Sequence, residues 1–409
     1  TTIETSNSEF LCIETPYSFK LLVQEIEAMG VSSRLIGNKI LEKWNQESNK
    51  FENIFTLDNN FVEEIKGYYV SDGTKLTKPL RNFHNKIKEL LLQGTINKSK
   101  KKSLSLIDLS CGRGGDLYKW KKSGFNKILG IDIDENNIEE GAKKRFNQMI
   151  LNSNKFISEW ARNTDIKFLI KDTSEPLFNY DVDPYDDQFI PEHTSTYISK
   201  INSYDTAAMF YSIHYLFSSE DKIYTFFKNV SHSINTNSYL LVTTLDGNVV
   251  FQDLQKNPDG LEGKLLNPKT GKLSKPVWSI KKVEDFPFDT LPSDTENGFN
   301  NKIKVFVESI GREYEEYLVH PSLLISIAYK FGFELASCND LIQFNSNINT
   351  TNTIFNKSTD TFDNIYKSFI SNDNEINNLG KSKFASLKQY SNYHRYFIFK
   401  KSYDINSNS

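Results

Sequence analysis

The sequence predicts an α/β fold with a mainly parallel, Rossmann-like sheet. Three observations lead to this prediction. From residue 103 onward, short apolar runs alternate with segments of helical periodicity. A glycine-rich turn directly follows the first of these runs, at 112–115. The chain of 409 residues is 38% hydrophobic and 13% aromatic, which supplies enough apolar surface for a large core.

The strands and helices follow from these segments in chain order. Each expected strand is a short run rich in apolar residues, and each expected helix has apolar residues three and four positions apart. Strands and helices that alternate in this way favour a parallel sheet with crossover helices. The expected strands are 104–109, 127–132, 166–170, 204–210, 239–244, 332–336 and 395–400, and the expected helices are 80–92, 116–122, 135–150, 220–234 and 323–331.

The residues before and between these segments have other patterns. Apolar positions at helical spacing between Tyr17 and Asn49, interrupted at Gly30, predict two N-terminal helices. Three stretches, 178–203, 252–301 and 345–393, are rich in Asp, Pro, Gly, Asn or Ser and are expected to be long loops, either lids or disordered. We therefore expect an N-terminal helical extension over 1–79, an α/β domain over 80–401 with three insertions, and a tail over 402–409.

Composition excludes several classes of protein. The three cysteines, Cys12, Cys111 and Cys338, are too few and too far apart for a disulfide framework or a Cys-x-x-Cys zinc site, which indicates a reducing, cytoplasmic compartment. No apolar run approaches the roughly 18 residues of a membrane span. The net charge of −3 means that a nucleic acid, if bound, is held by local patches of positive charge.

The most informative segment runs from Ile107 to Asp116 and reads Ile-Asp-Leu-Ser-Cys-Gly-Arg-Gly-Gly-Asp. Its glycines allow a sharp turn from strand to helix and a close approach to a ligand. The third glycine of the dinucleotide fingerprint is missing, and Asp116 would repel a pyrophosphate, so NAD is disfavoured. S-adenosylmethionine, with its sulfonium cation and amino-acid end, fits the carboxylates of Asp108 and Asp116 better.

Two further acids follow the next two expected strands. Asp132 comes 20 residues after Gly112, where a carboxylate can accept both ribose hydroxyls, and Asp172 is placed to bind the adenine amino group. Each feature also has a purely structural interpretation: the glycines as a plain βα connection, Asp132 as a helix cap, and Asp172 as the start of a turn. Their joint occurrence at strand ends favours the cofactor.

These segments resemble a known family. Residues 81–92 and the segment Leu106-Ile-Asp-Leu-Ser-Cys-Gly-Arg-Gly-Gly-Asp-Leu-Tyr-Lys-Trp-Lys-Lys122 resemble the mRNA cap guanine-N7 methyltransferases, including those of the capping enzymes of large cytoplasmic DNA viruses. The resemblance continues at 130–133, 211–215, 315–319 and 396–401. It implies a class I S-adenosylmethionine-dependent methyltransferase fold, with a mainly parallel seven-stranded sheet and helices on both faces, located in the cytoplasm, a viral factory or a virion.

The resemblance also implies the residues of the site. Around S-adenosylmethionine it implies Lys88, Asp108, Ser110, Gly112, Asp116, Asp132 and Asp172, with Phe210 and Ser212 closing the adenosine and methionine side. For the cap it implies His84, His214, Tyr215, Glu316 and His394, with Arg113 and Lys144 reaching the cap phosphates. It implies no metal.

The chemistry of the two ligands agrees with this assignment. A guanine presents its N1–H and N2–H₂ donors to a carboxylate, so Glu316 suits the base edge, while Tyr215 can stack on the ring. N7 of guanine carries a free lone pair and loses no proton when it is methylated, so no residue is expected to act as a general acid or base. We expect Tyr215, Glu316 and His214 to act by alignment.

Four positions depart from the family pattern. His84 stands where Asn is usual, Leu245 replaces a Pro, His394 replaces a Tyr, and Phe210 replaces a Gln. Imidazole can still stack or donate a hydrogen bond, so a pocket with altered details is expected. The histidines could also be structural residues. Similarly, the basic run from Lys119 to Lys122 is either a solvated helix face or a guide for the triphosphate bridge.

Two other functions stay open on the sequence. One is a methyltransferase that acts on a small molecule or on DNA, although the Asp/Asn-Pro-Pro-aromatic motif of amino-methylating DNA enzymes is replaced after the fourth strand by Phe210-Tyr-Ser-Ile-His-Tyr215. The other is a non-catalytic subunit that binds RNA or stimulates a partner; such a subunit would be expected to lose the glycine turn and Asp132. Titration with S-adenosylmethionine would separate these functions.

Capping also requires triphosphatase and guanylyltransferase activities. The Lys-x-Asp-Gly nucleophile motif of guanylyltransferases is missing, because Ser71-Asp-Gly-Thr-Lys75 lacks the preceding lysine. The sequence begins at Thr1 without a methionine. We therefore expect the chain to be the C-terminal methyltransferase part of a larger polypeptide or complex that carries the other activities, and to act on the capped 5′ end of mRNA.

Overall fold

The computed structural model describes residues 76–96, 104–178, 202–267, 270–348, 353–369 and 378–403, together with the backbone of five short strands nearer the N-terminus. The chain divides into two units, Thr1–Lys66 and Gly67–Ser409. This division comes earlier in the chain than the boundary at residue 79 expected from the sequence. Among the described residues, no helix combines the length and the apolar character needed to cross a bilayer.

The first unit contains strands where helices were expected. Strands β1 (Thr2–Glu4) and β2 (Phe10–Cys12) pair antiparallel, and β3 (Ser33–Ile36), β4 (Lys39–Asn45) and β5 (Lys50–Asn53) form a three-stranded antiparallel sheet. The prediction of a helix near Leu35–Trp44 is therefore wrong. A run this short fits both the helical and the strand period, and the pairing of β4 with two neighbours decides between them. The other predicted helix, from Tyr17 to the interruption at Gly30, lies outside the described residues.

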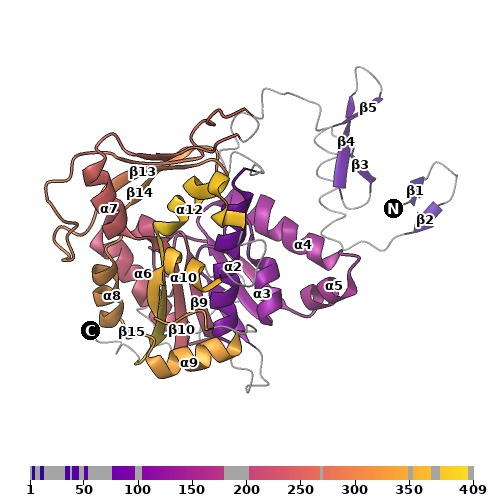
Figure 1. Cartoon of the computed structure of the whole chain (residues 1–409). Helices are drawn as coiled ribbons and strands as arrows, with labels where there is room; N and C mark the ends of the chain where they lie inside the picture. The colour runs from indigo at the N-terminus through magenta and orange to yellow at the C-terminus, as the bar shows by residue number, and fades with distance from the viewer. Residues whose placement is uncertain are drawn as a thin grey trace. The chain divides into compact units, whose positions relative to one another are not determined.

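The second unit is built on a sheet that includes β9, β10 and β15, which are labelled in Figure 1. Its strand order is β15-β17-β10-β9-β6-β7-β8, and β16 pairs with β17. Strands β8, β7, β6, β9 and β10 are parallel, and β17 runs antiparallel between β10 and β15. This confirms the predicted Rossmann-like, mainly parallel sheet. The bounds are β6 Ser105–Asp108, β7 Lys127–Asp132, β8 Asp165–Ile170, β9 Tyr204–Phe210, β10 Ile234–Leu245, β15 Phe333–Leu335, β16 Thr359–Thr361 and β17 His394–Lys401.

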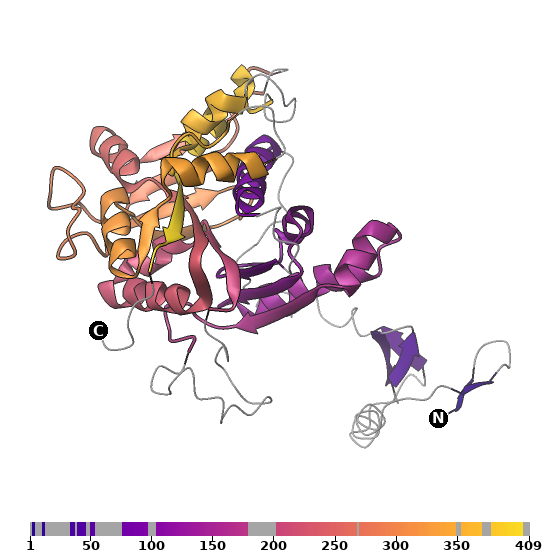
Figure 2. The ribbon, with the colours of Figure 1, turned by 90° about the horizontal axis from the view of Figure 1, so that it is seen from below.

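Helices cover both faces of this sheet (Figure 2). Alternate residues of one strand point to different cores: Leu106 of β6 packs with α2 (Lys78–Gly94) and α3 (Leu117–Ser123), whereas Ile107 packs with α6 (Glu220–Ser233) and α8 (Pro321–Lys330). Because both faces are covered, the inner parallel strands are mainly apolar, whereas the edge strand β8 alternates exposed and partly buried residues. Pro79 lies in the first turn of α2, where its missing N–H costs no helix hydrogen bond. The apolar face of α2 then packs on the sheet.

The expected helix 135–150 is two elements of different pitch. Residues Asn137–Lys143 form a π-helical segment, η3, and α4 (Lys144–Ile150) continues from it. A π-helical turn holds more residues than an α-helical turn, so it changes which later side chain faces the sheet. A further helix, α5 (Lys155–Arg162), follows and was not predicted.

Two of the expected long loops contain regular structure. Residues 252–301 include the end of α7 (Gly247–Lys256), β11 (Leu261–Gly263) and β12 (Trp278–Lys282), and the two strands join β13 (Lys302–Val307) and β14 (Glu313–Tyr317) in a four-stranded antiparallel sheet. Residues 345–393 include the end of α9 (Cys338–Asn347), β16, α10 (Phe362–Phe369), two short 3₁₀ turns and α12 (Ala385–Asn392). The described parts of both stretches therefore correct the prediction of loops.

Buried aromatic residues explain why these two stretches contain helices and strands. Trp278 of β12 is fully buried and its Nε1–H donates to the Ser386 carbonyl at 2.8 Å, which joins the antiparallel sheet to α12. Phe362 and Tyr390 are buried as well, although the surrounding sequence is polar. Most of the remaining expected loop, 178–203, lies outside the described residues, at 179–201. The basic run 98–102 and the tail from residue 404 lie outside them as well.

Candidate functional site

A cavity of about 1130 Å³ lies at the carboxyl ends of β6, β7, β8 and β9. The strand order reverses at β6, because the chain proceeds to β7 and β8 on one side and returns to β9 and β10 on the other. Open α/β sheets bind their ligands at such a reversal. Other walls of the cavity come from α2, the 3₁₀ turn η4 (Ile213–Ser218), β14 and α12.

The glycine turn after β6 is held close to β7. Gly112 and Gly114 have φ values of +53° and +70°, which non-glycine residues rarely adopt. A Cβ atom on Gly114 would lie 3.0 Å from Cα of Ala142, whereas one on Gly112 or Gly115 would meet no atom within 4 Å. The turn is thus closely packed on one side and leaves open space over Gly112 and Gly115.

Asp132 fixes this turn through its carboxylate. One oxygen accepts the Gly112 N–H at 2.8 Å, and the other accepts the Asp134 N–H at 3.0 Å and the Asn137 side-chain amide at 3.1 Å. Burial raises the pKa of Asp132. The capping role suggested for Asp132 belongs to Asp134, whose side chain accepts the N–H groups of Asn136 and Asn137 at the start of the following helix.

Asp172 lines the same cavity and also forms a turn. Its Oδ1 accepts both the N–H of Ser174, at 2.8 Å, and the hydroxyl of Ser174, at 2.7 Å. Asp172 therefore starts a turn, as its purely structural interpretation expected. The proximity of Asp172 to an adenine amino group stays a prediction.

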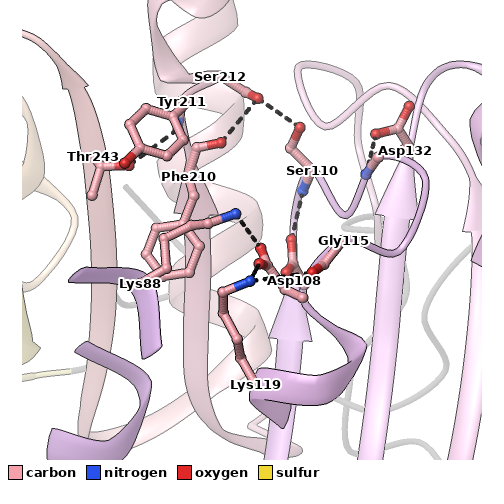
Figure 3. Close-up of polar contacts among 12 residues, drawn as sticks. Lys88, Asp108, Ser110, Gly115, Lys119, Asp132, Phe210, Tyr211, Ser212 and Thr243 are labelled. Atoms are coloured by element: carbon pink, nitrogen blue, oxygen red, sulfur yellow. Dashed lines mark hydrogen bonds and ion pairs between the residues drawn. The ribbon is translucent and has the colours of Figure 1, made fainter. Parts of the chain in front are cut away.

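Asp116 lines the cavity and lies between two lysines, Lys88 and Lys119, which are labelled in Figure 3. Lys88 of α2 is 2.8 Å from Oδ2 and Lys119 of α3 is 2.7 Å from Oδ1, and all three side chains are at most 14% exposed. Burial alone would raise the pKa of Asp116, but the positive charges of the two lysines outweigh it and lower that pKa to about 2. Asp116 is therefore ionised at neutral pH and joins α2 to α3.

Asp108 lies beneath the turn and does not line the cavity. Its Oδ1 accepts the Ser110 N–H at 3.2 Å, and its buried Oδ2 has no hydrogen-bond partner among the described residues. Burial, with a smaller contribution from the charge of Asp116, raises the pKa of Asp108 to about 7. A cation placed above the turn would lower this pKa and favour the carboxylate.

The end of β9 is joined to the turn by two serines. The Ser110 hydroxyl donates to the Ser212 hydroxyl at 2.7 Å (Figure 3). Directly before Ser212, Tyr211 has a φ of 59°, in the left-handed region, and its N–H donates to the Thr243 carbonyl at 2.9 Å. Such backbone strain in a non-glycine residue persists only where its surroundings impose it, and it is frequent at functional sites. The left-handed backbone conformation of Tyr211 directs its ring toward His84 of α2.

An aromatic group around His84 lines the next part of the cavity. The Tyr211 ring stacks on His84 at 5.3 Å between centroids, and the His394 ring lies 4.7 Å from His84 in an edge-on arrangement. His84 Nε2 is 3.0 Å from the Ser391 hydroxyl, and His394 Nδ1 is 3.0 Å from the Tyr390 carbonyl. Both histidines therefore have the hydrogen-bonded structural role and line the cavity as well.

These histidines are neutral at physiological pH. Burial lowers the pKa of His84 well below its usual value, and the nearby His394 and Lys88 lower it further. Burial lowers the pKa of His394 to about 4. The wall that they form with Tyr211 is thus uncharged and can contact a flat ring.

On the β14 side of the cavity, Glu316 faces His214. Glu316 Oε2 is 3.6 Å from His214 Nε2, and the His214 and Tyr215 rings are 4.2 Å apart. Burial raises the pKa of Glu316 to about 8 and lowers that of His214 to about 3, so at neutral pH the contact joins two largely uncharged groups. Neither ring nitrogen of His214 has a hydrogen-bond partner among the described residues. A ligand that donates hydrogen bonds would stabilise the Glu316 carboxylate.

Several cationic side chains line the cavity, and one of those predicted does not. Lys144 pairs with Glu140 on the surface, with its side chain 59% exposed, and the adjacent Arg145 lines the cavity instead. The π-helical segment before Lys144 shifts the register and accounts for this difference. The cationic residues that line the cavity are Arg81, Lys88, Arg113, Arg145, Lys171, Lys222 and Arg312.

Apart from Asp108 and Lys144, every residue predicted for the site lines this one cavity, and their individual roles stay predictions. Sequence reasoning missed Tyr211, Tyr390, Arg145 and Arg312. Tyr211 lies within the segment 211–215 that carried the resemblance, so only its ring contact was unforeseen. Arg312, between β13 and β14, and Tyr390, on α12, belong to two regions whose elements the sequence did not predict. No group of three or more His, Cys, Asp or Glu side chains among the described residues could hold a metal ion.

Comparison with known proteins gives consistent matches. A family model described as the mRNA (guanine-N(7))-methyltransferase domain matches residues 43–401. A probable mRNA-capping enzyme of Acanthamoeba polyphaga mimivirus is 26% identical over 371 residues, which cover 85% of this chain and 29% of that protein. The mRNA cap guanine-N(7) methyltransferase of Saccharomyces cerevisiae is 25% identical over 352 residues, which cover 82% of this chain and 71% of that protein.

A solved structure, a putative S-adenosylmethionine dependent methyltransferase from Listeria monocytogenes, aligns with a TM-score of 0.38 at 12% identity, over 78% of this chain and 98% of that chain.

We predict that Asp116→Asn lowers the free energy of unfolding at pH 7 by about 3–5 kcal/mol, because it leaves two buried lysines without a negative partner. The matched control is Glu89→Gln, which removes a carboxylate that is also shared by two lysines, Lys86 and Lys122, but with the Lys122 side chain 57% exposed. A more exposed pair is worth less than about 1 kcal/mol. Urea unfolding of the two variants measures the difference.

We predict that the difference in the free energy of unfolding between wild type and Asp116→Asn becomes smaller as the pH falls. Because the folded pKa of Asp116 is about 2, below its unfolded value, its stabilisation is complete above the unfolded pKa and is lost as the pH falls toward 2. Wild type and Asp116→Asn should therefore converge in acid. Equal losses for Asp116→Asn and Glu89→Gln at pH 7 would contradict the central role given to Asp116.

Proposed function

The chain belongs to the mRNA (guanine-N(7))-methyltransferase family, whose model matches residues 43–401, and from that premise we propose that it transfers a methyl group from S-adenosylmethionine to N7 of the guanosine cap at the 5′ end of mRNA. One observation supports this function above others. The buried carboxylate of Glu316 and the glycine turn after β6 line the same cavity, so a guanine and a methyl donor can be held together.

The residues around the turn fit the donor. When bound, S-adenosylmethionine supplies an electrophilic methyl group on a sulfonium sulfur. The open space over Gly112 and Gly115 admits the part of it that lies against the turn, and the orphaned Oδ2 of Asp108 lies below a site that would receive positive charge. Lys88 suits the carboxylate of the amino-acid end. Asp132, fixed by three hydrogen bonds, suits the ribose hydroxyls.

The residues on the β14 side fit a guanine. An ionised Glu316 can accept both N1–H and N2–H₂ of the base, a pattern that adenine does not offer. Tyr215 and the neutral wall of His84 and Tyr211 supply flat surfaces for stacking. Arg113 and Arg312, which also line the cavity, suit the triphosphate bridge.

The chain promotes the reaction by positioning the two reactants and by the electrostatic field of its charged side chains. N7 has a lone pair and no proton to lose, so none of the cavity residues needs to accept or donate a proton. Holding two reactants at attack distance can contribute about 7–11 kcal/mol to the barrier reduction. The methyl transfer moves positive charge from sulfur to the base, and the ionised Glu316 stabilises that charge on the base.

The extent of the match bears on the whole protein. The chain spans 29% of the mimivirus capping enzyme that it resembles and 71% of the yeast methyltransferase. We infer that triphosphatase and guanylyltransferase domains act with this chain, either in the same polypeptide or in a complex. We also infer a cytoplasmic location, including viral factories or virions.

Methyl transfer to three acceptors tests the proposed function. With radiolabelled S-adenosylmethionine, we expect the chain to methylate GpppA at N7, to methylate GTP more weakly, and to leave uncapped RNA unmodified. Nuclease digestion and chromatography identify the methylated position. Binding of S-adenosylmethionine without transfer to GpppA would favour a non-catalytic subunit, and methylation of uncapped RNA would favour another methyltransferase.

In the same assay we predict that Glu316→Gln raises the KM for GpppA about tenfold to a hundredfold, the usual cost of losing a bidentate contact to a base. The dissociation constant of S-adenosylmethionine, measured by calorimetry, should not change. The control is Glu313→Gln, an exposed glutamate of the same strand that does not line the cavity. A Glu316→Gln enzyme with wild-type KM would remove Glu316 from the cap site.

We predict that cap affinity rises with pH up to about 8 and then levels off. The base accepts its contacts from the carboxylate form, whereas burial raises the pKa of Glu316 to about 8 in the free protein. At pH 7 the affinity for GpppG should therefore be about tenfold below the plateau. Fluorescence titration between pH 6 and 8.5 measures it.

Glu316→Gln is the control for this pH dependence. The glutamine resembles the protonated acid, so the variant should bind GpppG with an affinity close to that of wild type at pH 6 and should not gain affinity as the pH rises. Parallel pH profiles for the two proteins would show that another group titrates.

A further inference from the structure

A second cavity, of about 680 Å³, is lined by residues of α2 and α3. It lies between α2, α3 and the beginning of α5, and Asn85 lines both cavities. Lys119 lines the second cavity while its ammonium group holds Asp116, a wall residue of the first. The two cavities therefore adjoin at Asn85 and are linked by the ion pair of Lys119 with Asp116.

The second cavity is positively charged. Lys86, Lys119, Lys121 and Lys122 line it, and Glu89 is the one acidic residue in its described lining. Lys86 and Lys122 share that single carboxylate, at 3.1 Å and 2.7 Å. Because the whole chain carries a net charge of −3, this excess is local. A cationic groove on a weakly acidic protein is suited to a polyanion.

Two exposed aromatic rings lie among these lysines. Tyr118 is 55% exposed and Phe156 is 80% exposed, and both line the second cavity. A groove that serves a protein partner would be expected to have a contiguous apolar centre, whereas here the rings alternate with lysines and asparagines. Lysines that follow a phosphate backbone, with rings on which bases stack, are the usual features of a site for single-stranded nucleic acid.

We propose that this surface, which we call the lysine–aromatic groove (Asn85, Tyr118, Lys121, Lys122 and Phe156), binds the single-stranded RNA that follows the cap. This inference rests on the proposed function, because it requires the capped end to occupy the first cavity. The lysines contact phosphates and the two rings stack on bases without selecting a sequence. The basic run 119–122 then has a role beyond that of a solvated helix face.

The test compares a short and a long acceptor. GpppG occupies the first cavity alone, whereas a capped single-stranded RNA of about twenty nucleotides also reaches the groove. For wild type we expect a KM at least severalfold lower for the capped RNA than for GpppG. In Tyr118→Ala/Phe156→Ala, the KM for the capped RNA should rise about tenfold, the usual effect of removing base stacking, and the KM for GpppG should stay within twofold of wild type.

Lys121→Ala/Lys122→Ala tests the phosphate contacts separately. Binding of an uncapped RNA of the same length, followed by fluorescence anisotropy, should depend on salt with a slope smaller by about 0.7 for each phosphate that the variant no longer neutralises. The matched controls lie outside the groove: Tyr329→Ala, whose ring is 57% exposed on α8, and Lys256→Ala/Lys272→Ala, which removes two exposed lysines. We expect neither control to change the KM for capped RNA, and thermal melting checks that every variant is folded.

The outcomes separate this inference from the proposed function. If wild type methylates neither GpppG nor capped RNA, the proposed function fails. If wild type methylates both with the same KM, or if the groove variants raise the KM for both acceptors equally, the function stands and the groove does not bind RNA. Folded groove variants that leave RNA affinity and its salt dependence unchanged would also overturn the inference, and would point to a protein partner.

Discussion

The ion triad of Asp116 with Lys88 and Lys119 is the interaction on which the rest of the site depends. It joins α2, the glycine turn and α3 through contacts of 2.7 and 2.8 Å between largely buried charges. Burying these charges is costly, and their attraction offsets the cost only while all three stay in place. Because α2 carries His84 and Asn85 as well as Lys88, the triad sets where the wall of the first cavity lies and where the second cavity adjoins it.

Equally buried carboxylates differ in charge because their neighbours differ. Asp116 has two lysines within contact distance and a pKa of about 2, whereas Glu316 faces a neutral histidine and has a pKa of about 8. The first is a permanent charge that holds structure together. The second is largely protonated until a hydrogen-bond donor enters the cavity. This difference suits a site for a cationic methyl donor and a guanine. When the proposed base binds, Glu316 loses its proton, whereas Asp116 stays ionised throughout.

The sequence predicted the central sheet well because its signal is local. Residues 127–132 and 204–210 are apolar runs whose bounds agree with β7 and β9, as expected for parallel strands buried on both faces. The sequence-based predictions fail where contacts between distant segments determine the local structure. The run 39–45 fits either period, the π-helical segment moves Arg145 into the place expected of Lys144, and polar composition concealed the elements that carry Trp278 and Tyr390. Glu316 was reached through the family resemblance, whereas the antiparallel sheet that positions it was not foreseen.

The family resemblance leads one to expect an amide at position 84 and a tyrosine ring at position 394, where this chain has His84 and His394. In the structure each imidazole packs against aromatic rings and also has a hydrogen-bond partner, the Ser391 hydroxyl for His84 and the Tyr390 carbonyl for His394. Both partners come from α12, within a region whose Asn-rich sequence is typical of a loop. Since burial keeps both rings neutral, the two histidines form a flat, uncharged wall beside Tyr211. The strained backbone of Tyr211 places its ring against His84. A change at either histidine would therefore alter the packing around the Tyr211 ring.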